Sequence, residues 1–175
     1  GAGSSYGAFL APLGHIAARL HAIGNQARVA ADGGTYRPFF MVCAHAGLKT
    51  VKAGDIVTVD VDLAMGNELS VNLAIKEFEK YGFDKVFDGN KIAVVADHFT
   101  PAKDIRTAEM VRQIGRWCEK LGVRHFFDVG PKGGIEHIIL PDNGLIRPGS
   151  VIVGGDSHTT TYGAWGAFSS GVGSS

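Results

Sequence analysis

The sequence predicts an α/β fold of three layers, α/β/α, with a largely parallel sheet. Short apolar runs rich in Val and Ile, the pattern of buried strands, alternate along the chain with longer segments of helical periodicity. Glycine closes two of the helical segments. Polar residues follow two of the apolar runs directly, as they do at the carboxyl ends of strands where open α/β sheets bind ligands.

The first elements lie between residues 56 and 121. IVTVDV at 56–61 predicts a strand, and ELSVNLAIKEFEKY at 68–81 predicts a helix that Gly82 ends. KIAVVA at 91–96 predicts the next strand. Residues 101–121 predict a long helix with its apolar residues on one face, with Thr100 as N-cap and Pro101 as first residue.

The remaining elements follow the same alternation. A strand is expected at 123–129, then a short helix carrying His137, a turn at 141–144 and a last strand at 151–155. The glycine-rich tail contains neither a Walker sequence nor a G-x-G-x-x-G fingerprint, which argues against a phosphate loop. Close helix packing, where side chains would obstruct, is the expected role of its glycines.

Acid and imidazole side chains stand together after two predicted strands. Asp97 and His98 follow residues 91–96, and Asp156 and His158 follow residues 151–155 with Ser157 between them. A carboxylate beside an imidazole raises the pKa of the imidazole and fixes its orientation, which suits a general acid. The alternative is a solvated turn without chemistry. A hydrolase using Ser157 would need a nucleophile elbow of the G-x-S-x-G kind, which the sequence lacks.

Three segments together carry a resemblance to a known family. DHFTPAKDI, GIEHIILPDNG and GGDSHTTTYGAWGAFSSGVGSS occur in this order, and VKAGDIVTVDVDLAMGNELS at 51–70 precedes them. Residues 46–175 resemble the amino-terminal part of the 3-isopropylmalate dehydratase large subunits, within the aconitase superfamily. The implied fold is the first domain of the aconitase iron–sulfur region. Homoaconitases and 2,3-dimethylmalate dehydratases have similar motifs.

The resemblance implies a hydro-lyase that interconverts 2- and 3-isopropylmalate in leucine biosynthesis by removing and re-adding water. Asp97 and His98 would protonate the departing hydroxyl group. His137 and Asp156 would form a second pair near a water on the iron of a [4Fe-4S] cluster. That iron would act as a Lewis acid on the substrate, a di- or tricarboxylic acid.

The resemblance also assigns supporting roles. His158 would hydrogen-bond the same water, Ser157 would support the substrate or the turn, and Asn67 would contact the substrate through its amide. His137 alone, in an apolar stretch, would otherwise be interpreted as a buried core histidine. A small subunit with a swivelling domain is the implied partner.

The cysteines depart from the family pattern. The family binds its cluster through three cysteines, two of them in a C-x-x-C spacing, whereas this chain has only Cys43 and Cys118, each in an apolar setting. No metal ligand is therefore predicted here. The chain is expected to be an incomplete large subunit that is inactive alone. A non-catalytic binding or scaffold module with the same fold is the alternative.

Residues 1–45 depart from the family and form an atypical leader in this interpretation. Apolar residues at helical spacing over 13–23 predict a short amphipathic helix. An organellar transit peptide, which would imply an organellar matrix instead of the cytoplasm, is one interpretation of this acid-poor segment. Seventeen basic and 17 acidic residues give no net charge, so nothing indicates nucleic-acid or membrane partners.

Overall fold

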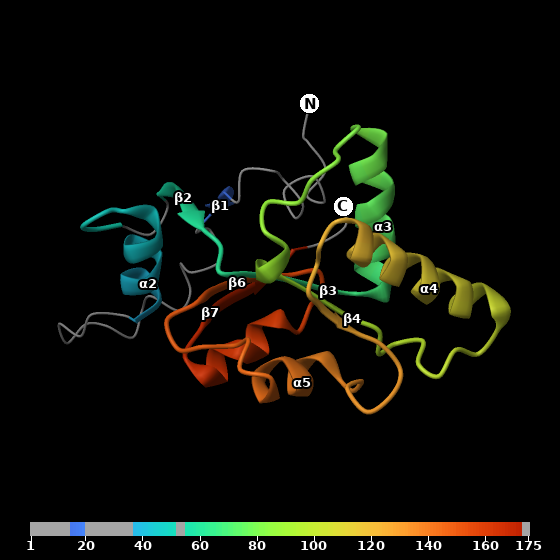
Figure 1. Ribbon diagram of the computed structural model, residues 1–175. Coiled ribbons are helices and arrows are strands. Elements are labelled where there is room, and N and C mark those ends of the chain that lie inside the picture. The colour runs from blue at the N-terminus through green and yellow to red at the C-terminus, as the bar shows by residue number, and fades with distance from the viewer. Residues whose placement is uncertain (1–14, 20–36, 52–54, 173–175) are drawn as a thin grey trace.

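A five-stranded, fully parallel sheet forms the centre of the computed structural model, which describes residues 15–19, 37–51 and 55–172 (Figure 1). The strand order is β5-β4-β3-β6-β7, and every neighbouring pair is parallel. The strands are β3 (Leu63–Asn67), β4 (Ile92–Val95), β5 (His125–Phe127), β6 (Val151–Gly154) and β7 (Phe168–Gly171). The prediction of a largely parallel sheet is confirmed.

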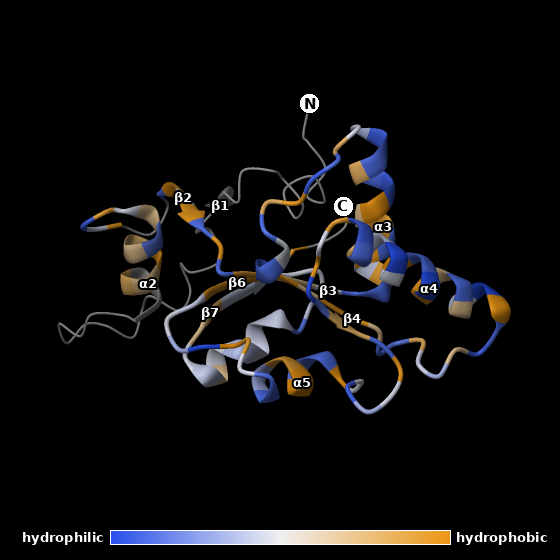
Figure 2. Cartoon of the chain, in the orientation of Figure 1, coloured by the Kyte–Doolittle hydropathy of each residue, from blue (hydrophilic) through white to orange (hydrophobic). Residues whose placement is uncertain are grey.

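Helices cover both faces of the sheet, which gives the three predicted layers (Figure 1). On one face lie α3 (Glu68–Lys80) and α4 (Ile105–Lys120), and on the other lie α5 (Glu136–Asp142) and the 3-10 helix η4 (Thr159–Trp165). Alternate strand residues serve the two cores: Val94 packs towards α3 and α4, whereas Val95 packs towards α5 and η4. β4 and β6 are accordingly apolar and buried along their length, as the orange colour in Figure 2 shows.

Two helices begin at reciprocal caps. The side chain of Asn67 accepts from the backbone N–H of Ser70, and the Ser70 hydroxyl bonds the backbone of Asn67, so α3 starts immediately after β3. Asp104 and Thr107 form the same arrangement at α4. The prediction of Thr100 as N-cap is therefore wrong: its hydroxyl donates to the carbonyl of Ala96 instead, and α4 starts four residues later.

Two strands of the central sheet were not predicted. β3, its middle strand, has the sequence LAMGN, and β7 lies in the glycine-rich tail at 168–171. The predicted strand at 56–61 exists as β2 (Ile56–Asp60), but it pairs antiparallel with β1 (His15–Arg19) in a separate two-stranded sheet. The helix expected over 13–23 is contradicted where the structure describes it, because residues 15–19 are extended.

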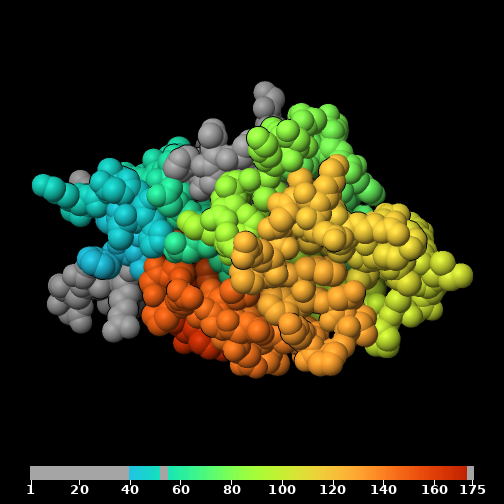
Figure 3. All heavy atoms as spheres, viewed as in Figure 1, coloured from blue at the N-terminus to red at the C-terminus, as the bar shows by residue number. Residues whose placement is uncertain are grey.

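Smaller elements complete the structure. The 3-10 helix η3 (Gly89–Lys91) precedes β4, and α5 extends through Pro141 to Asp142, so the turn expected at 141–144 begins later than predicted. Helix α2 (Arg37–Ala46) packs at the far side of the molecule from α4 (Figure 3). Within the described ranges, no helix is long and apolar enough to span a membrane.

Helix α2 is attached to the sheet through a small apolar cluster and one ion pair. Val42 is buried against Val57, Val59 and Val151. Nε2 of His45 lies 2.7 Å from Oδ2 of Asp62, at the start of β3. The division of the chain at residue 45 remains a prediction, and Val42 shows that the preceding residues contribute to the buried interior.

Candidate active site

The candidate site lies where β4, β3 and β6 end, side by side in the sheet. Asn67 is the last residue of β3, Asp97 follows β4 closely, and Asp156 follows β6. From β3 the chain proceeds outwards to β4 and β5 on one side, and returns to β6 and β7 on the other. Open α/β sheets bind ligands at such a reversal, at the carboxyl ends of the strands.

The first acid–imidazole pair has the geometry expected of an oriented histidine. Nδ1 of His98 donates to Oδ1 of Asp97 at 2.5 Å, and the other Asp97 oxygen accepts the backbone N–H of Glu136 at 2.8 Å. Burial lowers the pKa of His98, but the hydrogen bond and charge of Asp97, with a contribution from the charge of Glu68, outweigh burial and raise it above its ordinary value. The His98 side chain is 39% exposed, and no hydrogen bond from its Nε2 occurs among the described residues.

The second pair is His137 with Asp156. Nε2 of His137 donates to Oδ2 of Asp156 at 3.1 Å, and Nδ1 lies 3.2 Å from the hydroxyl of Tyr162. That hydroxyl donates in turn to the backbone carbonyl of Glu136 at 3.3 Å. Tyr162 is fully buried, and burial raises its pKa. Both ring nitrogens of His137 therefore face polar protein atoms, Nε2 the Asp156 carboxylate and Nδ1 the Tyr162 hydroxyl.

Asp156 and His158 lie in the turn after β6. The backbone N–H of His158 donates to Oδ2 of Asp156 at 2.5 Å, and Nδ1 of His158 lies 3.1 Å from the Ser157 hydroxyl. The His158 ring is 6.2 Å from that of His137, centroid to centroid, and its side chain is 78% exposed. The structure thus brings His137 and His158 together. Glu136, the neighbour of His137 in the chain, connects them to Asp97 and His98 because its backbone N–H donates to the Asp97 carboxylate.

Two buried acids in the site were not predicted as functional residues. Glu136 is 1% exposed; Nδ2 of Asn67 donates to its Oε1 at 3.5 Å, and Oε2 has no hydrogen-bond partner in the part of the chain that the structure describes. Burial, together with the charges of Asp97 and Asp156, raises the pKa of Glu136 to about 8. Glu68 is fully buried and accepts backbone hydrogen bonds after β4. The sequence signal for Glu136 was an acid within an otherwise apolar stretch, IEHII.

Asn67 is engaged within the protein. Its Oδ1 caps α3, its Nδ2 donates to Glu136, and it is 3% exposed. Its predicted contact with substrate remains a prediction, as does the supporting role of Ser157, whose side chain is exposed in the turn.

Glycines let the chain pack closely around the Asp156 turn. A Cβ on Gly154 would lie 2.0 Å from Oγ1 of Thr159, and one on Gly171 would lie 2.4 Å from the carbonyl oxygen of Asp156. Close packing in the tail is therefore confirmed at Gly171, but against a turn and not against a helix. It is wrong at Gly163, where a Cβ would meet nothing within 4 Å.

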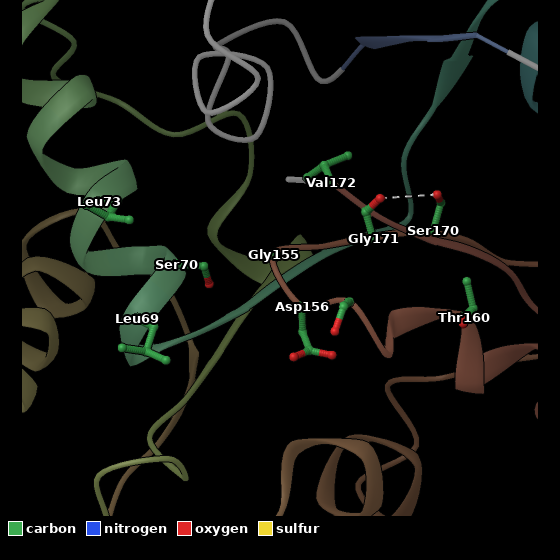
Figure 4. A pocket seen from close by; sticks show the side chains of 10 residues that line it. Leu69, Ser70, Leu73, Gly155, Asp156, Thr160, Ser170, Gly171 and Val172 are labelled. Carbon is green, nitrogen blue, oxygen red and sulfur yellow. Dashed lines mark hydrogen bonds between the residues drawn. The ribbon is translucent and has the colours of Figure 1, made fainter. Parts of the chain in front are cut away.

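A pocket of about 510 Å³ opens beside Asp156 (Figure 4). Leu69 and Leu73 of α3 form an apolar wall, and Val172 faces the same space from the end of β7. Asp156 and Ser157 place polar groups at its rim. The pocket therefore combines apolar surface with the acid of the second pair.

The donor set of the site does not fit an iron–sulfur cluster. Such clusters bind chiefly thiolates, and the site offers imidazole and carboxylate groups. Of the two cysteines in the chain, Cys118 is buried in the core face of α4, where burial raises its pKa to about 12, and Cys43 lies in α2. Ligand atoms of His137, Asp156 and His158 lie within 4.8 Å of one another, but they already hydrogen-bond one another, so we identify no metal ligands here.

Comparisons with known proteins give a matching family and several similar proteins. The sequence model of the family described as "Aconitase family (aconitate hydratase)" matches residues 26–175. A 3-isopropylmalate dehydratase large subunit of Clostridium botulinum (strain Eklund 17B / Type B) is 52% identical over 134 residues, 77% of this chain and 32% of the relative. Proteins with the same name from Moorella thermoacetica and Aquifex aeolicus are 50% and 52% identical over 134 residues, 77% of this chain and 32% and 31% of the relatives. These matches confirm the resemblance carried by the three motifs, and the chain spans about a third of the length of these relatives.

Proposed function

We propose that this chain, which belongs to the aconitase family, provides acid–base groups of a hydro-lyase that interconverts 2- and 3-isopropylmalate in leucine biosynthesis. The proposal is supported by relatives named 3-isopropylmalate dehydratase large subunit. It is also supported by two acid–imidazole pairs at the carboxyl edge of the sheet, Asp97 with His98 after β4 and Asp156, after β6, with His137 of α5. The reaction removes a hydroxyl group and a proton from neighbouring carbons as water. It then adds water back so that the hydroxyl group and the proton have exchanged carbons.

The observation that carries the proposal is the Asp97–His98 pair. Hydroxide is a poor leaving group and needs a proton as its bond to carbon breaks. Asp97 holds Nδ1 of His98 and raises the pKa of the ring, so His98 retains a transferable proton near neutral pH. Its Nε2, which bonds none of the residues that the structure describes, then delivers this proton to the departing hydroxyl oxygen, and takes one back in the reverse direction, when water is added.

The second pair has a different task in this scheme. His137 directs both nitrogens at protein atoms, so it does not give a proton to the substrate without losing a contact. It orients Asp156, whose Oδ2 also accepts from the backbone of His158. His158 is the exposed histidine of the turn next to this pair. It is then the group that hydrogen-bonds the water or hydroxyl group.

The rest of the active site lies outside the residues of this chain in our proposal. The family's [4Fe-4S] cluster takes its thiolate ligands from elsewhere in the large subunit, and a small subunit supplies the base for the carbon-bound proton. We therefore expect no turnover by this chain alone, and a multiply charged carboxylic acid as substrate of the complete enzyme.

The test compares His98→Asn with His125→Asn, a control at the amino end of β5 and thus at the opposite end of the sheet. Both substitutions are made in the complete large subunit, assembled with its small subunit and cluster, and hydration of the unsaturated diacid is followed. We expect His98→Asn to lower kcat by roughly 100-fold or more, and His125→Asn to retain activity. Equal activity of the two variants would refute the role of His98, and binding of diacids without turnover by the wild-type assembly would favour a non-catalytic module.

A further inference from the structure

We propose that Glu68 is a positioning residue that holds the Asp97–His98 turn in place and keeps negative charge beside the His98 ring. The effect of Glu68 on catalysis rests on the function proposed above. Glu68 is the first residue of α3, and no accessible surface of it remains. A buried carboxylate persists only where polar partners replace its water.

The partners of Glu68 are the two backbone amides that flank His98. The N–H of Asp97 donates to Oε2 at 3.1 Å, and the N–H of Phe99 donates to Oε1 in a short contact. One side chain from the start of α3 therefore fixes the backbone on both sides of the proposed proton donor. These partners are 29 and 31 residues away in the chain, so a role confined to its own helix does not account for Glu68.

The hydrogen bonds also define the charge of Glu68. Both oxygens face N–H donors, which satisfies a carboxylate, whereas a protonated acid would turn an O–H towards a donor. The amino-terminal end of α3 adds a favourable dipole for this charge. Glu136, in contrast, has only Asn67 and His137 near its Oε1, each at 3.5 Å, and its Oε2 has no partner among the described residues; burial raises its pKa.

The charge of Glu68 reaches His98. One ligand atom from each of Glu68, Asp97 and His98 lies within 4.8 Å of the others. Asp97 provides the direct hydrogen bond, and Glu68 is a further acid whose charge favours the protonated ring. In this arrangement Asp97 orients the imidazole, and Glu68 orients Asp97 through its backbone.

The experiment titrates the histidines of the 175-residue chain by NMR, in the wild type, in Glu68→Gln and in Glu77→Gln. Glu77 is a matched control on the outer face of α3, where its carboxylate bonds Lys80. In Glu68→Gln we expect the pKa of His98 to fall, because a negative charge near the ring is removed, and the amides of Asp97 and Phe99 to exchange faster. His45, at the other end of the sheet, should titrate unchanged in both variants.

An unchanged His98 titration in a folded Glu68→Gln chain would overturn the proposal. If Glu68→Gln fails to fold, hydrogen exchange of the wild type decides: the amides of Asp97 and Phe99, which donate to Glu68, should exchange slowly, and exchange as fast as in an unfolded chain would overturn the proposal. Neither measurement requires a cluster, a partner or turnover. A complete enzyme that fails to dehydrate isopropylmalate would refute the proposed function and leave this role of Glu68 standing.

Discussion

Replacing Glu136 by Gln tests whether this buried acid is neutral in the folded chain. Gln has the shape of a protonated Glu and can still accept from Nδ2 of Asn67. Burial and the charges of Asp97 and Asp156 raise the pKa of Glu136 from its ordinary value of 4.5 to about 8. The wild type therefore folds with a proton on this group at neutral pH, and the variant imitates that state.

The magnitude follows from the difference between the two pKa values. Because the folded pKa is the higher one, the contribution to stability is complete below pH 4.5 and is lost as the pH rises through 8. At about 1.4 kcal/mol for each pH unit, the loss is on the order of a few kcal/mol. Glu136→Gln removes this loss, so it should resemble the wild type at acidic pH and exceed its stability at pH 9.

The assay is chemical denaturation of both chains at several pH values from 5 to 9, with Glu77→Gln as control. Plotting the difference in the free energy of unfolding against pH cancels groups that titrate alike in both chains. The difference should grow from acidic pH to pH 9 for Glu136→Gln and stay flat for the control. Parallel curves for wild type and Glu136→Gln would refute the assignment of a neutral Glu136.

Three further substitutions test the packing and hydrogen bonds of the site. Gly154→Ala should destabilise the fold by about 3 kcal/mol in denaturation, because its Cβ overlaps Thr159, whereas Gly163→Ala should change little; equal losses would contradict the packing argument. Asn67→Ala should cost about 1 kcal/mol through the lost cap of α3, and an unchanged unfolding midpoint would contradict it. Tyr162→Phe should cost about 1 kcal/mol in denaturation, because Nδ1 of His137 and the backbone carbonyl of Glu136 both lose their contact with the hydroxyl; an unchanged free energy of unfolding would contradict it.

The sequence was sufficient for the fold class because its strongest local signals agree with the tertiary structure. The apolar run before Asp97 forms β4, and the periodic segment up to Lys120 forms α4. β3 carries no such signal: LAMGN lacks β-branched residues and ends in an amide that caps the next helix. It is a strand because β4 and β6 pair with it on both sides, and those contacts come from distant segments.

The candidate site likewise contains residues with a local sequence signal and residues that only distant contacts identify. His98 and His158 were predicted because polar residues directly after apolar runs are a local pattern. Glu68 and Glu136 were not, because an acid at a helix start is usually solvated, and only partners about 30 to 70 residues away show that these two are buried. Tyr162 likewise gains its importance from its contact with His137. Burial of a polar side chain depends on the whole fold, so a local pattern does not reveal it.

The glycines beneath the Asp156 turn have a consequence for how this family tolerates mutation. In a library selected only for folding, Gly154 and Gly171 should resist almost every replacement, while the solvent-facing rings of His98 and His158 should accept many. If the proposed function holds, selection for growth without leucine in the complete enzyme would reverse the tolerance of the two histidines. Positions that tolerate substitution under selection for folding but not under selection for growth would be those needed for catalysis. Positions that tolerate it under neither selection would be those needed for the fold.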